Sequence, residues 1–140
     1  MDITFSLPYV FFPGSNPEDN AHALKALLEC LVTLNMAFLR NHSVPSLYRS
    51  GVVYGRTKEW DTIPAMYAKK YGDCKSLSAA LIAEYRNAGI AADPVFRWVR
   101  NRIDGTDYHI LVRRVSGFED PSKILGMGRD ENVHFRNNRG

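Results

Sequence analysis

The spacing of apolar residues predicts two long helices, the first over residues 17–40. Apolar side chains recur there three or four residues apart, as one face of a helix requires. The predicted stripe comprises Leu24, Leu27, Leu28, Leu31, Leu34 and Phe38. Pro17 and Asp19 suit its first turn, where an acid complements the helix dipole. Cys30 lies within this segment, and we interpret it as a small apolar filler of the core.

The second helix is predicted from about Cys74 to Ala88, and Gly89 suits the position after its end. The predicted apolar stripe of this helix comprises Leu77, Leu81, Tyr85 and Ala88. Between the two helices, residues 41–63 are interrupted by proline and glycine and are expected to be irregular. The letters SGVVY within them suggest a short strand, and IPAMYAKKYG suggests a short helix that ends before Gly72.

After the second helix, from Ile90 onward, the pattern becomes typical of strands. The letters AGIAADPVFRWV lead into one strand, and YHILVRRV forms a second. Asp104-Gly105 is a strong hairpin turn signal between them. A further turn is predicted at residues 116–117, and FEDPSKIL begins a third strand or a loop. Helices followed by an antiparallel meander predict an α+β fold.

The composition indicates one ordinary globular domain over residues 1–140. Hydrophobic residues make up 45% of the chain and charged residues 24%, and a net charge of +3 is too weak to indicate nucleic-acid binding. No apolar run approaches the roughly 18 residues that span a bilayer, and the apolar N-terminus lacks the basic region of a signal peptide. We read that N-terminus as a strand or extended arm, expect no membrane partner, and expect the cytoplasm as the location. Residues 1–42 are expected to form the arm and first helix, and 128–140 a short tail.

Cys74 stands where the second helix begins, although serine, threonine or aspartate would cap a helix better. A helix N-terminus carries about half a positive charge, which favours the thiolate form of a cysteine placed there. Backbone N–H groups left unpaired at such an end can hold an oxyanion. This position therefore suggests a nucleophile, which needs a base and a group that orients the base.

Of the four histidines, His109 is the candidate base. It stands near the start of the second predicted strand, on a sheet against which the Cys74 helix is expected to pack. His22 lies early in the first helix, His42 in a loop and His134 in the tail. No cluster of histidine, cysteine and acid has the spacing of metal ligands, and no glycine-rich phosphate loop is present, so neither a metal nor a cofactor is expected.

The blocks GDCKSLSAALIAEYRNAGIAA, YHILVRRV and EDPS resemble the core of the transglutaminase-like superfamily, over residues 47 to 127. That resemblance implies a papain-like fold with Cys74 as nucleophile, His109 as base and Asp120 as orienter. The letters LYRSGVVY and EDPSKILGM are also similar to small transglutaminase-like proteins encoded by tailed bacteriophages. The family often has an upstream aromatic residue that donates to the oxyanion, for which Trp60 and Tyr54 are the candidates. Core packing is the alternative role for both rings.

The choice of orienter stays open at this point. Eleven residues separate His109 from Asp120, which is short for the family. A tight hairpin at residues 116–117 would pair Asp120 with Arg113. Asp120 would then share the face of His109 but lie too far along it for a direct hydrogen bond, unless a bulge or loop shifts it. Asp107, two residues before His109, also shares that face and is the alternative orienter.

Two classes of function follow. The first is a thiol enzyme that acts on amides of a protein or peptide substrate: a protease, an amidase or a transglutaminase. The second is a non-enzymatic protein that keeps the scaffold and binds phage virion or assembly proteins, with the host cytoplasm or the virion as its location. A metal-dependent hydrolase ranks third, because no ligand cluster is present.

Overall fold

The computed structural model describes residues 17–99 and 107–128, and it confirms the α+β class. The N-terminal arm before residue 17, the Asp104-Gly105 turn and the tail after residue 128 lie outside the described residues. The elements are α1 (Pro17–Asn41), the 3-10 helix η1 (Leu47–Arg49), β1 (Val53–Tyr54), α2 (Ile63–Lys69), β2 (Tyr71–Gly72), α3 (Cys74–Asn87), β3 (Asp93–Val99), β4 (Asp107–Arg114), β5 (Gly117–Glu119) and α4 (Pro121–Ile124).

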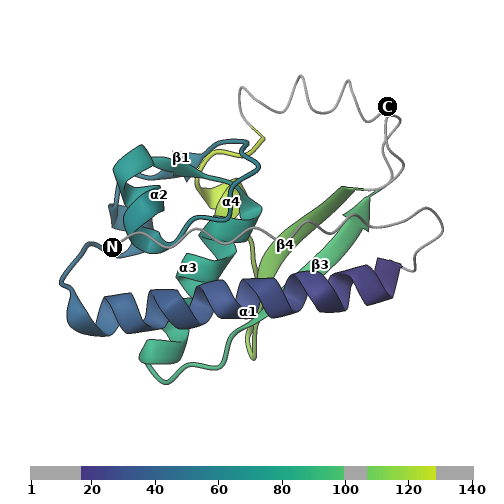
Figure 1. Cartoon of the computed structure of the whole chain (residues 1–140), viewed down its shortest axis with the longest axis horizontal. Coiled ribbons are helices and arrows are strands. Elements are labelled where there is room, and N and C mark those ends of the chain that lie inside the picture. The colour runs from purple at the N-terminus through teal and green to yellow at the C-terminus, as the bar shows by residue number, and fades with distance from the viewer. Residues whose placement is uncertain (1–16, 100–106, 129–140) are drawn as a thin grey trace.

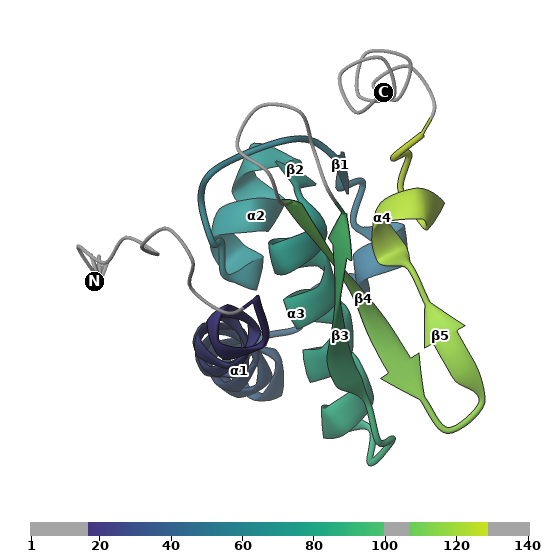
Figure 2. The same cartoon turned by 90° about the vertical axis from the view of Figure 1, so that its right-hand side faces the viewer.

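Helix α3 lies at the centre of the fold, between α1 and the sheet of β3, β4 and β5 (Figures 1 and 2). Helices α2 and α4 lie near its N-terminal end (Figure 2). Every residue from Lys75 to Ala83 is buried, so this helix has no solvent-facing side along that stretch. The predicted apolar stripe is therefore too narrow, because the buried surface extends around the whole helix in this stretch. Leu77 and Leu81 are buried as predicted, whereas Ala88 is exposed.

Helix α3 ends in the motif that its glycine predicted. Gly89 has φ +78°, and the N–H of Ile90 donates to the carbonyl of Tyr85 at 2.9 Å. The N–H of Gly89 donates to Arg86 at 3.0 Å. Together these bonds form a Schellman motif, which satisfies carbonyls that the last turn would leave unpaired.

Helix α1 packs on α3 through one side only. Leu24, Leu28 and Leu31 are buried as predicted, but Leu34 is 54% exposed, and Asn35 takes a fully buried position instead. Cys30 is exposed, so its interpretation as a core filler is wrong. The apolar composition of α1 exceeds what one contact face needs.

Because of that composition, α1 from Asp19 to Asn41 is long and apolar enough to cross a membrane by those two measures alone. It is the one such helix in the described part of the chain, which corrects the expectation that no segment qualifies. The signal is weak, since a core helix passes the same test.

Helices α1 and α3 are joined by an ion pair. Arg86 of α3 makes a bidentate ion pair with Glu29 of α1, with N–O distances of 2.6 and 3.0 Å, which holds the two helices together.

Strands β3, β4 and β5 form the predicted antiparallel meander, in the order β3-β4-β5. His109 on β4 lies opposite Arg97 on β3. Arg114 pairs with Gly117, and the two residues between them form the turn. The turn predicted at residues 116–117 is therefore one residue too late, because Val115 belongs to the turn and not to the strand.

A second, two-stranded sheet pairs β1 with β2 in parallel. The short strand β1 agrees with the expectation for SGVVY, whereas β2 was not predicted. It occupies two residues between Lys70, which ends α2 with φ 71°, and the start of α3. β2 thus fixes the approach of the chain to Cys74.

Candidate active site

Asp73, not Cys74, caps helix α3. The Asp73 carboxylate accepts the N–H of Lys75 at 3.1 Å, and its carbonyl accepts that of Leu77 at 3.0 Å. Cys74 is therefore the first residue inside the helix and not its N-cap. The expectation that Cys74 stands at the capping position is wrong, because Asp73 is the N-cap.

The three letters GDC each have a physical reason. Gly72 is buried, and a Cβ added there would lie 2.5 Å from the sulfur of Met66. Asp73 supplies the cap, and Cys74 places its half-buried thiol at the positive end of α3. The N–H of Cys74 lies in the first turn of the helix, on the same residue as the thiol.

His109 on β4 joins Cys74 to Asp120. Its Nε2 lies 2.8 Å from Oδ2 of Asp120, and the Cys74 side chain lies near enough to the ring to contribute to its raised pKa. Nε2 is the ring nitrogen that the carboxylate occupies. The structure therefore brings together the three residues that the sequence proposed as nucleophile, base and orienter.

A buried hydrogen bond fixes the helix that carries Cys74 against the strand that carries His109. The hydroxyl of Ser78, one turn after Cys74, donates to the carbonyl of Ile110 at 3.1 Å. Both residues are fully buried. This contact sets the position of His109, the neighbour of Ile110, relative to the thiol. The sequence analysis did not single out Ser78, although a serine inside an otherwise apolar helix face was a signal for such a bond.

The charges around His109 favour its protonated form. Burial alone lowers its pKa, but hydrogen bonds to Asp120 and Cys74 and the charges of both groups outweigh burial and raise the pKa to about 9. At neutral pH the ring is therefore an imidazolium. A cation in this place stabilises a thiolate on Cys74.

Asp120 reaches His109 because of the shifted turn. The expected pairing with Arg113 is wrong: continued by one step, the strand register places Asp120 beside Leu111, the next residue on the face of His109. At that diagonal spacing side chains can touch. The hydrogen bond therefore forms with Asp120, and the side chain of the rival acid, Asp107, lies outside the described part of the structure.

Asp120 also caps α4, because its Oδ1 accepts the N–H of Lys123 at 3.3 Å. Burial raises the pKa of this carboxyl, but the hydrogen bond and charge of His109, with help from Lys123, lower it overall. The carboxylate is thus ionised and held in a fixed orientation against the ring.

The two aromatic candidates lie on the segment that precedes α3. Trp60 is partly buried against the core, and its ring lies 5.8 Å from Nζ of Lys75, the residue after Cys74. Tyr54 is on β1, also partly buried, and its N–H donates to the carbonyl of Leu125 at 2.9 Å. Both rings pack against the hydrophobic core, which is the alternative role given to them, and Trp60 also faces the ammonium of Lys75.

The remaining histidines lie elsewhere, and no metal site emerges. His22 is exposed on α1, the ring of His42 stacks on Phe38 at 4.2 Å, and His134 lies outside the described residues. Within residues 17–99 and 107–128, no group of three histidine, cysteine or acidic side chains is arranged to hold a metal ion.

Comparison with known proteins adds no relative: no protein-family model, curated protein or solved structure matches this chain.

Proposed function

We propose that the protein is a cysteine-dependent acyl-transfer enzyme of the transglutaminase-like kind, with a papain-like core. The observation that carries this proposal is the position of His109, which is hydrogen-bonded to Asp120 and lies near enough to Cys74 for that side chain to contribute to its raised pKa. A nucleophile, a base and an orienter in hydrogen-bond contact are the requirement for covalent catalysis by a thiol. The central helix that begins at Cys74 and packs on an antiparallel sheet supports a papain-like core.

The first half-reaction begins from the ion pair of the Cys74 thiolate and the His109 imidazolium. The sulfur attacks the carbonyl carbon of an amide, and the carbonyl oxygen becomes an oxyanion. His109 then gives its proton to the amide nitrogen, the carbon–nitrogen bond breaks, and an amine leaves, or ammonia where the amide is that of a glutamine side chain. The acyl group remains on Cys74 as a thioester.

The second half-reaction decides the product. Neutral His109 takes a proton from water or from a primary amine, which attacks the thioester carbon. The carbon–sulfur bond breaks, and the thiolate and imidazolium are restored. Water yields an acid, as in a protease or amidase, whereas an amine yields a new amide, as in a transglutaminase.

For the oxyanion, we propose the N–H of Cys74 as one donor. Asp73 accepts the N–H groups of Lys75 and Leu77, whereas the N–H of Cys74 lies in the first turn on the same residue as the nucleophile. A backbone N–H there is fixed in place and needs no rearrangement during the reaction.

For its setting, we propose a cytoplasmic protein or, in a phage, a protein of the host cytoplasm or the virion, with a protein or peptide substrate. The α1–α3 contact supports a core rather than a membrane role for α1.

The test incubates the protein with a glutamine-containing peptide library, with and without a labelled primary amine. Amine incorporation is expected of a transglutaminase, and cleavage alone of a protease or amidase. Cys74→Ala should remove either product while leaving the melting temperature nearly unchanged, because Asp73 keeps the cap. Cys30→Ser, which changes the exposed thiol of α1, is the matched control and should retain full turnover. If neither product forms and Cys74→Ala keeps the biological role, a non-enzymatic scaffold that binds virion or assembly proteins replaces this proposal.

A further inference from the structure

Lys75, the residue after Cys74, is buried in the first turn of α3 with 6% of its surface exposed. Lysine is among the residues least often buried, because its charge loses its hydration there. A cation at a helix N-terminus also opposes the helix dipole. Helix stability therefore does not account for a lysine at this position.

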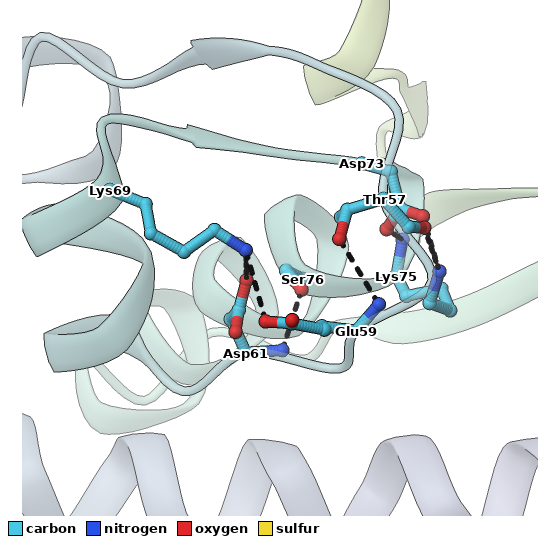
Figure 3. A network of polar contacts seen from close by, with 7 residues as sticks. All are labelled: Thr57, Glu59, Asp61, Lys69, Asp73, Lys75 and Ser76. Carbon is cyan, nitrogen blue, oxygen red and sulfur yellow. Dashed lines mark hydrogen bonds and ion pairs between the residues drawn. The ribbon is translucent and has the colours of Figure 1, made fainter.

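The Lys75 ammonium joins three parts of the site. It pairs with the carboxylate of Asp73, donates to the carbonyl of Thr57 at 3.2 Å (Figure 3), and faces the ring of Trp60. Thr57 and Trp60 belong to the segment that precedes α2, whereas Asp73 and Lys75 belong to the start of α3. A single buried charge thus binds this segment to the helix end that carries the nucleophile.

Three further contacts fix the same segment at its other end. The N–H of Asp61 donates to the hydroxyl of Ser76 at 2.9 Å, and Lys69 of α2 pairs with Asp61 at 2.8 Å and with Glu59 at 3.2 Å (Figure 3). The Glu59 side chain is 70% exposed. The contact of Lys75 is therefore the buried anchor for residues 57–60, and that of Glu59 is an exposed one.

We infer that Lys75 is a positioning residue that holds residues 57–61, with Trp60, against the first turn of α3 as a wall of the acyl-binding side of the site. The inference rests on the proposed function, since it assigns this segment to substrate binding. Asp73 neutralises the charge of Lys75, so Lys75 acts through geometry and not through the charge state of the thiol. A buried ion pair is weak as a source of stability, and fixing one arrangement is a role that such pairs do fill.

The experiment compares Lys75→Met, Lys75→Arg and the double variant Asp73→Asn/Lys75→Met, which leaves no charge unpaired. Glu59→Gln is the matched control on the same segment. Two readouts are taken: hydrogen exchange of the amides of residues 57–61, and kcat and KM on a peptide substrate. The first readout needs no turnover, so a failure of the proposed function is recognised separately.

In Lys75→Met and in the double variant, exchange of these amides should rise by about tenfold or more. KM should rise by about tenfold while kcat changes less than about threefold, because binding and not chemistry is disturbed. Lys75→Arg should recover part of both losses, since a guanidinium can keep the pair with Asp73. Glu59→Gln should stay within about twofold of wild type, as exposed ion pairs contribute little.

Unchanged exchange in a folded double variant would overturn the inference. So would an equal fall of kcat in every Lys75 variant with KM unaltered, which would make Lys75 a structural residue only. A wild-type protein without turnover would remove the proposed function alone, and the exchange result would then decide by itself whether Lys75 holds the segment.

Discussion

Asp73 and Asp120 perform the same local task on the two sides of the site but differ in the direction in which their surroundings shift the pKa of the carboxyl. Each caps a helix, α3 or α4, and each pairs with a cation, Lys75 or His109. Burial outweighs the partner at Asp73 and raises the pKa of its carboxyl, whereas at Asp120 the partner outweighs burial and lowers it. On the nucleophile side, Asp73 is therefore a buried residue that holds the start of α3 in place. On the base side, Asp120 is a carboxylate whose ionised form His109 stabilises.

The two ion pairs also differ in the sequence separation of their members. Asp73 and Lys75 are two residues apart in one turn, so the contact follows from the helix start. Asp120 and His109 are on different elements, and their contact depends on the register of β4 with β5. The first side is encoded locally, and the second depends on the fold.

Loss of the ion pair between His109 and Asp120 should have the largest effect on turnover. Asp120→Asn keeps a side chain that can cap α4, so it removes the charge and not the cap. Turnover should fall by about 10²- to 10⁴-fold, because the imidazolium loses its stabilising carboxylate. The fall in activity above the pKa of His109, about 9, should move to lower pH. Steady-state rates over pH 5–10 check this.

Asp107→Asn is the matched control for that measurement, since this acid shares the strand of His109. It should leave turnover and the pH profile nearly unchanged. If it lowers turnover and Asp120→Asn does not, the orienter has been assigned to the wrong acid.

The contrast also predicts how stability depends on pH. The pKa of His109 is raised from 6.5 to about 9, so its contribution is fully present below 6.5 and is lost as pH rises through 9. The lowered pKa of Asp120 makes its contribution present above its usual value of 3.8 and lost as pH falls below it. The free energy of unfolding of wild type minus that of His109→Gln should therefore be largest between about pH 4 and 6.5, on the order of 2–3 kcal/mol.

Urea denaturation at a series of pH values measures this difference. Cys74→Ala should move the upper midpoint to lower pH, because the thiol side chain contributes to the raised pKa of His109. A difference that does not change from pH 6 to pH 10 would contradict the assigned charge state of the ring.

Much of the fold followed from the sequence, because α1, α3 and the strands are long enough to show a period. The errors arise where packing decides. Leu34 and Cys30 are exposed because, among the described elements, α1 packs mainly on α3, which no periodicity reveals. Val115, 97% exposed, extended the predicted strand by one residue because it is apolar and β-branched, although it lies in the turn.

The candidate site shows the same limit. Cys74, His109 and Asp120 were proposed from their order and their resemblance to a family, and the structure brings them together. Lys75 and Ser78 were not singled out. Polar residues on a helix are expected to face solvent, and α3 is instead surrounded by other elements.

On the nucleophile side, Gly72→Ala should cost about 1–3 kcal/mol of stability through overpacking. The added methyl group would lie 2.5 Å from the sulfur of Met66, which is itself fully buried and has little space to move. Thermal denaturation measures the loss. In a Met66→Ala background the same change should cost almost nothing, and a cost that persists there would place the strain in the backbone instead.

The smallest effect is expected where the two sides meet. Ser78→Ala removes the hydroxyl that donates to the carbonyl of Ile110, and should lower stability by about 1 kcal/mol. Ser76→Ala is the matched control, because it removes a buried hydroxyl from the same helix but from the contact with Asp61. Both variants should lose similar stability, yet Ser78→Ala alone should lower the titration midpoint of His109, by roughly a few tenths of a pH unit, as the contact with the thiol loosens. Proton NMR titration of the ring distinguishes them, and equal midpoints in the two variants would show that Ser78 does not join the halves of the site.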